Sequence, residues 1–82
     1  MKEKETYHDY RFEVYRNKAD WEKRREQIPN FPVCKHWYGI PEKRAEDIVL
    51  GIAIGLRARY AHPFVVLYRI EADKEVIVRT QQ

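Results

Sequence analysis

The apolar segment Asp47–Phe64, DIVLGIAIGLRARYAHPF, constrains the fold of this chain more than any other, because it fits two periodicities. With a period of two residues, its aliphatic side chains fall on one side, as in a strand with one buried face. With a helical period of three to four residues, the same segment forms a helix with apolar residues on most of its circumference. The alternating interpretation places five aliphatic residues on one side: Ile48, Leu50, Ile52, Ile54 and Leu56.

The residues that flank this segment favour the helix. Pro41 suits a first helical position, acidic residues follow it, and Arg57 and Arg59 come where the helix dipole favours cations. A strand would also leave residues 29–47 as one long unstructured connection, which is uncommon in a compact domain. The sequence therefore predicts a helix from Pro41 to about Tyr60.

The first part of the chain predicts one strand and one short helix. In residues 7–16, YHDYRFEVYR, apolar side chains alternate with more polar ones, which is typical of a strand with one buried face. Asn17 can cap a helix over residues 17–28, where only Trp21 and Ile28 are large and apolar. Because these two lie seven residues apart, we expect them on one face of that helix.

The C-terminal segments HPFVVLYRIE and KEVIVRTQ surround the charged turn EADK and predict a β-hairpin. A three-residue loop at Ala72, Asp73 and Lys74 keeps the arginines on one face, whereas a two-residue loop mixes them into both. With the longer loop, one face carries Phe64, Val66, Tyr68, Ile70, Val76 and Val78, and the other Val65, Leu67, Arg69, Ile77 and Arg79.

These elements predict an α+β fold in the order β-α-α-β-β, with a mostly antiparallel three-stranded sheet and both helices on one face. The 82 residues allow a single domain, residues 1–82, in which we expect residues 1–6 to be flexible. No signal-like leader or membrane-length apolar run is visible, so we expect a cytoplasmic protein without a membrane partner. A net charge of +3 mildly favours an anionic partner.

The residues suited to metal binding or nucleophilic catalysis are Cys34, His8, His36 and His62. A structural zinc site needs about four ligands, of which the CKH motif supplies two at most. A nucleophilic cysteine needs an oriented base, and His36, two residues from Cys34, cannot be assumed to face it. We therefore expect no metal, no cofactor and no catalytic residue.

Residues 29–41, PNFPVCKHWYGIP, contain three prolines and predict an ordered loop rich in aromatic residues. Its KHWY stretch combines cations with flat rings, which suits stacking on nucleic-acid bases, although Trp37 and Tyr38 also suit core packing. Arginines beside an aromatic residue on the outer sheet face add to this surface. The candidate nucleic-acid-binding residues are Arg11, Tyr15, Lys35, His36, Trp37, Tyr38, Arg57, Arg59, Arg69 and Arg79.

This set predicts a small basic, non-catalytic module that binds RNA, DNA or a ribonucleoprotein. An alternative comes from Val65, Leu67 and Ile77, because three aliphatic residues on one outer face indicate a covered surface. Gly51 and Gly55, four residues apart, allow another backbone to approach the helix closely, either from the chain's own sheet or from a twin helix. The alternative function is therefore an adaptor or inhibitor that binds a partner protein or a second copy of itself.

The segment His62–Arg79, HPFVVLYRIEADKEVIVR, resembles the end of bacterial RelE and ParE toxins. In that family the penultimate strand often ends in Tyr-Arg, and a charged turn and a Val/Ile-rich strand follow it. The resemblance implies an αβ toxin that acts on translating ribosomes or gyrase and is neutralised by an antitoxin. The functional arginines of RNA-cleaving members are not matched, since Phe64 occupies the first region and Gln82 ends the chain. A strand usual before the hairpin is also missing, so the resemblance implies a non-cleaving relative and carries over no catalytic residue.

Overall fold

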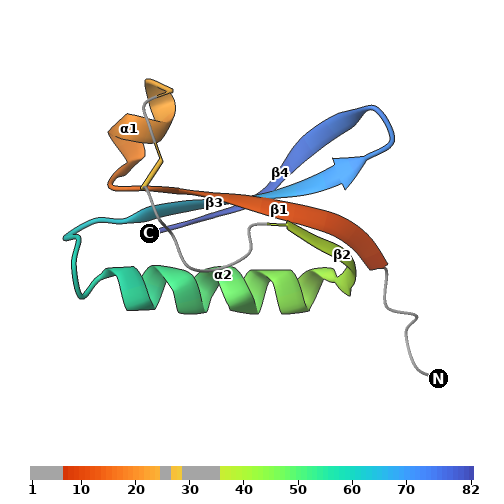
Figure 1. Ribbon diagram of the computed structural model, residues 1–82, viewed down its shortest axis with the longest axis horizontal. Helices are drawn as coiled ribbons and strands as arrows, with labels where there is room; N and C mark the ends of the chain where they lie inside the picture. Colours follow the sequence, from red (N-terminus) through yellow and green to blue (C-terminus); the bar gives the residue numbers. More distant parts are fainter. Residues whose placement is uncertain (1–6, 25–26, 29–35) are drawn as a thin grey trace.

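The computed structural model describes residues 7–24, 27–28 and 36–82. Its sheet is antiparallel throughout, in the order β2-β1-β3-β4, with a helix on each face (Figure 1). The predicted α+β fold with an antiparallel sheet is confirmed, but the sheet has four strands rather than three. The elements are β1 (Tyr7–Tyr15), α1 (Lys18–Glu22), β2 (His36–Pro41), α2 (Glu42–Leu56), β3 (Phe64–Glu71) and β4 (Lys74–Gln81).

Strand β2 lies within the segment that was predicted to be a loop. Its pairing with β1 sets Trp37 opposite Tyr10, and the Trp37 ring stacks on Phe12 with the centroids 5.0 Å apart. Gly39 has a φ of 62°, a left-handed conformation that glycine adopts easily, and its N–H donates to Asp9 Oδ1 at 2.9 Å. The register between the strands shifts at this point. Ring packing and an irregular edge thus accommodate residues that otherwise favour a loop.

Helix α2 runs along one face of the sheet, so the helical interpretation is confirmed (Figure 1). It ends at Leu56 rather than near Tyr60, and Pro41 takes the N-cap position with an extended backbone. Among the described residues, no helix is long and apolar enough to cross a membrane. The buried side of α2 consists of residues with short side chains four positions apart: Ala45, Val49 and Ala53.

The main core lies between α2 and the sheet. Phe12 of β1 and Leu67 of β3 pair directly across the strands and are 1% and 0% exposed. Val65 is also fully buried, so the prediction that Val65 and Leu67 lie on an outer face is wrong. Strand β3 is apolar on both sides, and only its pairing with β1 decides which side meets α2. The other residues of this core are Tyr10, Val14, Ile28, Ala45, Val49 and Ala53.

The turn between β3 and β4 also differs from its prediction. Lys74 pairs with Glu71, so it belongs to the strand and the turn has two residues rather than three. The register then shifts between Leu67 and Tyr68, and beyond this irregularity Val78 packs against the main core. Because a slip of one residue moves side chains to the other face, alternation alone could not place the residues of β4.

Helix α1 is short, and its start was predicted correctly. The Asn17 Oδ1 atom accepts a hydrogen bond from the Asp20 N–H at 2.8 Å, which confirms Asn17 as the cap. The helix ends at Glu22, and Arg24 has a φ of 56°, which is incompatible with further helix. The predicted helix over residues 17–28 is therefore only one turn and a half long.

A second apolar cluster lies between α1 and the sheet, on the face opposite α2 (Figure 1). Trp21 packs on Phe64 there with the ring centroids 5.2 Å apart, whereas Ile28 joins the main core. The two residues therefore do not share a helix face, and the prediction that both helices lie on one face is wrong. The cluster contains Tyr15, Phe64 and Val66, with Trp21 and Tyr68 packed against it.

Candidate functional site

The sheet face opposite α2 carries a polar network centred on Glu13, which we call the Glu13 cluster. The Glu13 carboxylate accepts hydrogen bonds from the Arg11 guanidinium at 2.9 Å, the Tyr15 hydroxyl at 3.0 Å and the Tyr68 hydroxyl at 2.9 Å. The Trp21 indole N–H donates in turn to the Tyr68 oxygen at 3.3 Å. These residues meet because Arg11 and Tyr68 pair directly across β1 and β3.

Arg11 is the cation of the Glu13 cluster and is held from several sides. Its Nε and Nη2 atoms donate to the two carboxylate oxygens of Glu75 at 2.5 and 2.7 Å. This hydrogen bonding raises the pKa of Arg11 above its ordinary value. The guanidinium also lies 4.2 Å from the centroid of the Tyr68 ring. That side of the ring is therefore covered, and a nucleotide base cannot stack there unless Arg11 moves.

The hydrogen bonds of the Glu13 cluster fix its protonation states. Burial alone would raise the pKa of Glu13, but the hydrogen bonds from Arg11, Tyr68 and Tyr15 together hold it below its ordinary value. Burial, and then donation to the Glu13 carboxylate, raises the pKa of Tyr15 to about 12. A charged carboxylate and neutral phenols suit structural stabilisation better than proton transfer near neutral pH.

A groove of about 510 Å³ lies beside the Glu13 cluster, next to α1. Three carboxylates and two guanidinium groups line it, together with aromatic and aliphatic side chains. Because negative charges outnumber positive ones, the groove does not favour a phosphate group. Its lining residues are Arg11, Glu13, Trp21, Glu22, Arg24, Tyr68, Glu75 and Ile77.

The arginines that were predicted to share one sheet face lie apart. Arg69 lies at the end of β3 nearest the start of α2, where it pairs with Glu42 at 3.3 Å and with Glu71 at 2.9 Å. Arg79 lies on β4 and donates to the Gln81 side chain at 3.0 and 3.1 Å. Of the predicted surface on the sheet, Arg11 and Tyr15 therefore come together in the Glu13 cluster, whereas Arg69 and Arg79 lie elsewhere.

The predicted KHWY surface is also divided. Lys35 lies outside the described residues, and His36 is exposed at the start of β2. Trp37 packs on Phe12 in the core, whereas Tyr38 is 73% exposed. The two aromatic residues thus have different roles, one in packing and one on the surface of an edge strand.

Potential metal ligands do not gather in the part of the chain that the structure describes. Within residues 7–24, 27–28 and 36–82, no three His, Cys, Asp or Glu side chains lie close enough to hold a metal ion. His8 packs edge-on against Tyr10, and His62 is exposed between α2 and β3. Cys34 lies outside the described residues.

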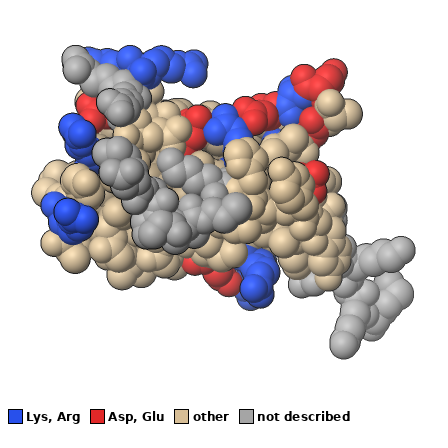
Figure 2. Space-filling view, viewed as in Figure 1, with Lys and Arg blue, Asp and Glu red and all other residues tan. Residues whose placement is uncertain are grey.

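One end of the molecule collects basic side chains from two separate segments. Tyr15 at the end of β1 pairs with Phe64 at the start of β3, so residues 16–24 and 57–63 leave the same end of the sheet. Figures 1 and 2 show α1 and the C-terminal end of α2 at this end of the long axis, with Lys and Arg side chains over it. The surface that we call the basic end consists of Arg16, Lys18, Lys23, Arg24 and Arg59.

The cations of the basic end differ from those on the sheet in their surroundings. All five are exposed, and among the described residues none of the five forms an ion pair. Arg57 lies nearby but donates to the Gln82 main-chain oxygen. At the opposite end, the tip of the β3–β4 hairpin carries charges of both signs, Glu71, Asp73, Lys74 and Glu75 (Figure 2). Glu71 and Glu75 there are ion-paired, with Arg69 and Arg11 respectively.

The sequence prediction included Arg59 of the basic end but missed the other four cations. Residues 1–30 contain 8 Lys/Arg and 7 Asp/Glu, so they form no basic block along the chain. The available signal was the run of cations around α1, a segment for which sequence analysis predicted only a short helix packed through Trp21 and Ile28. These cations form one surface with Arg59 only because the strand pairing brings the end of α2 to the same end of the molecule.

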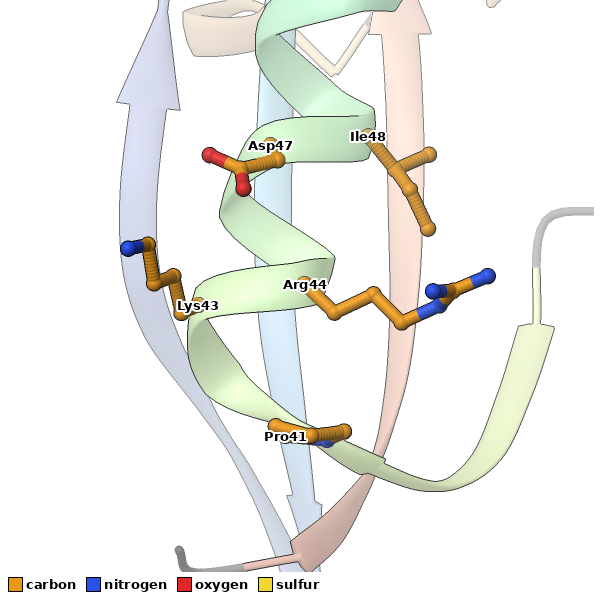
Figure 3. Close-up of a pocket in the computed structure, with 5 residues that line it drawn as sticks. All are labelled: Pro41, Lys43, Arg44, Asp47 and Ile48. Atoms are coloured by element: carbon orange, nitrogen blue, oxygen red, sulfur yellow. The ribbon is translucent and has the colours of Figure 1, made fainter.

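The outer side of α2 is exposed and has its own surface features. Figure 3 shows Lys43 and Asp47 on one side of the N-terminal half of this helix and Arg44 and Ile48 on the other. With Pro41 they line a shallow hollow of about 530 Å³. Its charged residues are of both signs, so the hollow does not define a ligand by charge.

The central part of α2 exposes both glycine and large aliphatic residues. No atom lies within 4 Å of the position that a Cβ would take at Gly51 or Gly55. These glycines therefore do not serve contact with the chain's own sheet. The exposed aliphatic residues here are Leu50 (38%) and Ile54 (56%). Of the predicted protein-interface residues, those that remain accessible are Ile77, Gly51 and Gly55.

Comparisons with known proteins assign no family to the chain. No protein-family profile, curated protein or solved structure matches it. The resemblance of the C-terminal hairpin to RelE and ParE toxins therefore stays a prediction.

Proposed function

We propose that this protein binds nucleic acid through the basic end and contacts the phosphate backbone rather than the base edges. The observation that carries the proposal is the gathering of five exposed cations, without ion-pair partners among the described residues, at one end of the molecule. Their N–H donors can bind phosphate oxygens without first leaving a carboxylate.

The chemistry of the basic end favours the backbone over the bases. Its side chains are lysines and arginines on one short helix and on three connecting segments, with no aromatic ring among them. Such cations neutralise phosphates and release counterions, which gives affinity with little sequence preference. The Glu13 cluster adds little to this function, because Arg11 is already paired with Glu13 and Glu75.

The proposal moves the nucleic-acid surface that sequence analysis predicted. It retains Arg59 and replaces the sheet arginines with the cations around α1. Arg69 is a poor phosphate ligand in this arrangement, since binding would compete with its ion pairs to Glu42 and Glu71.

Salt dependence tests the proposal directly. Binding of a mixed-sequence RNA oligonucleotide and of a short DNA duplex is measured by fluorescence anisotropy over a range of salt concentrations. If most of the five cations contact phosphates, log Kobs for the duplex should fall with log salt with a slope of about −4. The triple variant K18Q/K23Q/R24Q should weaken binding by roughly tenfold or more and make the slope less steep by about 3.

The matched control removes three cations elsewhere, K43Q/R44Q/K74Q, and so has the same net charge. It should bind much more tightly than the first triple variant if position matters rather than total charge. Equal losses in the two triple variants would contradict a localised basic end. Absence of binding by the unmodified protein at low salt would end the proposal, provided that circular dichroism shows it folded.

A further inference from the structure

Four residues form a continuous exposed stripe along the outer side of α2. Asp47, Leu50, Ile54 and Arg57 are spaced by three, four and three residues, which places them on one line of an α-helix. All four are exposed. The stripe lies on the exposed side of the helix, next to the row of buried residues Ala45, Val49 and Ala53 rather than opposite to it. Its last member, Arg57, is the C-cap of α2, four residues after Ala53.

The stripe is self-complementary when it is reversed. From Asp47 to Arg57 it runs acidic, aliphatic, aliphatic, basic in one direction and the opposite in the other. Lys43, four residues before Asp47 on the same side of α2, lies beyond the part that these four residues form (Figure 3). We infer that α2 is the interface of a homodimer, in which the α2 helices of two copies pack antiparallel. With the two-fold axis level with Ile52, Leu50 meets Ile54 of the second copy and Asp47 meets Arg57 of the second copy.

The charges select this arrangement over a parallel one. A parallel pair would set Asp47 against Asp47 and Arg57 against Arg57, which is repulsive, whereas the antiparallel pair makes two Asp–Arg contacts. The existing contact of Arg57 with the Gln82 oxygen uses the Nη2 atom only. A guanidinium has five N–H donors, so the remaining ones can reach the carboxylate of the second copy.

The glycines of α2 suit the same interface. Gly51 lies beside the stripe, and Gly55 lies further round the helix. Apart from the helix's own backbone and the neighbouring residues, nothing lies within 4 Å of a Cβ built on either glycine. The missing side chains allow another helix to approach closely, so that more of Leu50 and Ile54 is covered. Glycine weakens a helix interior, and contact with a second helix gives these two positions a use that the single chain does not show.

This inference stands apart from the proposed function, because Asp47, Leu50 and Ile54 lie outside the basic end. An antiparallel dimer would carry one basic end at each extremity. Loss of the dimer by D47R should therefore leave the nucleic-acid contacts of each chain in place.

Charge reversal and its rescue test the dimer. Sedimentation equilibrium of the unmodified protein should show a monomer–dimer equilibrium. D47R places arginine against Arg57 of the second copy, and R57D places aspartate against Asp47. Because the symmetry doubles each repulsion, either variant should raise the dissociation constant by roughly tenfold or more. The double variant D47R/R57D should dimerise again, and a mixture of D47R with R57D should form a one-to-one heterodimer.

Matched control variants distinguish the effect of the stripe residues from the effect of the same kind of substitution elsewhere on the surface. R59D makes the same charge change two residues off the stripe and should leave the dissociation constant within about twofold. I54S should weaken the dimer, whereas I77S, at an exposed aliphatic residue on β4, should not. A chain that stays monomeric at high concentration would overturn the inference and leave the stripe to a different partner. A dimer that withstands D47R and R57D, or a failed heterodimer, would also overturn it.

Discussion

At the scale of single residues, Glu13 is the acceptor at the centre of the Glu13 cluster. It accepts three hydrogen bonds on a sheet face that is otherwise largely apolar beneath α1. E13Q removes the charge that these donors stabilise and should lower the free energy of unfolding at neutral pH by about 1–3 kcal/mol. Chemical denaturation of both proteins measures the difference.

The pH dependence of that difference has a definite sign. Because the pKa of Glu13 is lowered in the folded state, its stabilisation is complete above the unfolded value of about 4.3 and is lost as the pH falls through the folded value. The gap between the unmodified protein and E13Q should therefore narrow in acid. E22Q changes an exposed carboxylate that lines the same groove, and its unfolding free energy should equal that of the unmodified protein at neutral pH. A loss of stability as large as that of E13Q would contradict a special role for Glu13.

Tyr15 makes the corresponding prediction in base. Its folded-state pKa is raised to about 12, so its contribution is complete below the unfolded value of about 10 and is lost as the pH rises toward 12. Unfolding measured between these values should show falling stability in the unmodified protein and a smaller fall in Y15F. The pKa values of Tyr10 and Tyr68 are raised as well, so ultraviolet titration of tyrosinate should show three phenols ionising above the ordinary value in the unmodified protein. Y15F should lack the one that ionises near pH 12.

At the scale of elements, the glycines of α2 and β2 should respond oppositely to alanine. Gly51 lies on the exposed side of its helix with space for a Cβ, so G51A should stabilise the monomer by about 0.5–1 kcal/mol, measured at protein concentrations too low for the dimer. Gly39 also has space, but its φ of 62° is unfavourable for alanine, so G39A should destabilise by about 1 kcal/mol or more. Thermal or chemical unfolding of both variants tests this, and the same sign for both would contradict it.

The elements also differ in how far local sequence determines them. Asn17 caps α1 as its residue type predicts, but the helix stops early because Arg24 turns away and Ile28 joins the core beside β1 instead. Strand β2 was missed, since Gly39 and the nearby prolines favour a loop locally. Its pairing with β1 and the stacking of Trp37 on Phe12 are long-range contacts that no local pattern contains.

At the scale of the whole molecule, the assignment of side chains to the two sheet faces is the most testable feature. Leu67 is fully buried between the sheet and α2, so L67A should cost about 2–5 kcal/mol. Ile77, which sequence analysis placed on the same face, is 49% exposed, and I77A should cost about 0.5 kcal/mol or less. Equal losses in urea unfolding would contradict the observed register. In a domain this small, L67A can leave little of the native state.

Charge is likewise organised only at this scale. The chain intersperses cations and anions, yet the folded molecule gathers five exposed cations at the basic end. Arg11 and Arg69 were among the candidate nucleic-acid-binding residues and are ion-paired in the structure. Each has one partner two residues away, Glu13 or Glu71, and a second that is distant along the chain, Glu75 or Glu42, so the local sequence alone could not establish how fully they are paired.

The sequence by itself determined the features that depend on neighbouring residues. Alternation in β1, the cap at Asn17, and the residues before and after α2 are local signals, because capping, dipole and side-chain periodicity act over a few residues. The tertiary structure alone decided the fourth strand, the side of β3 that meets α2, and the separation of charges. Each of these depends on which distant segments pair, and several pairings are compatible with the same local pattern.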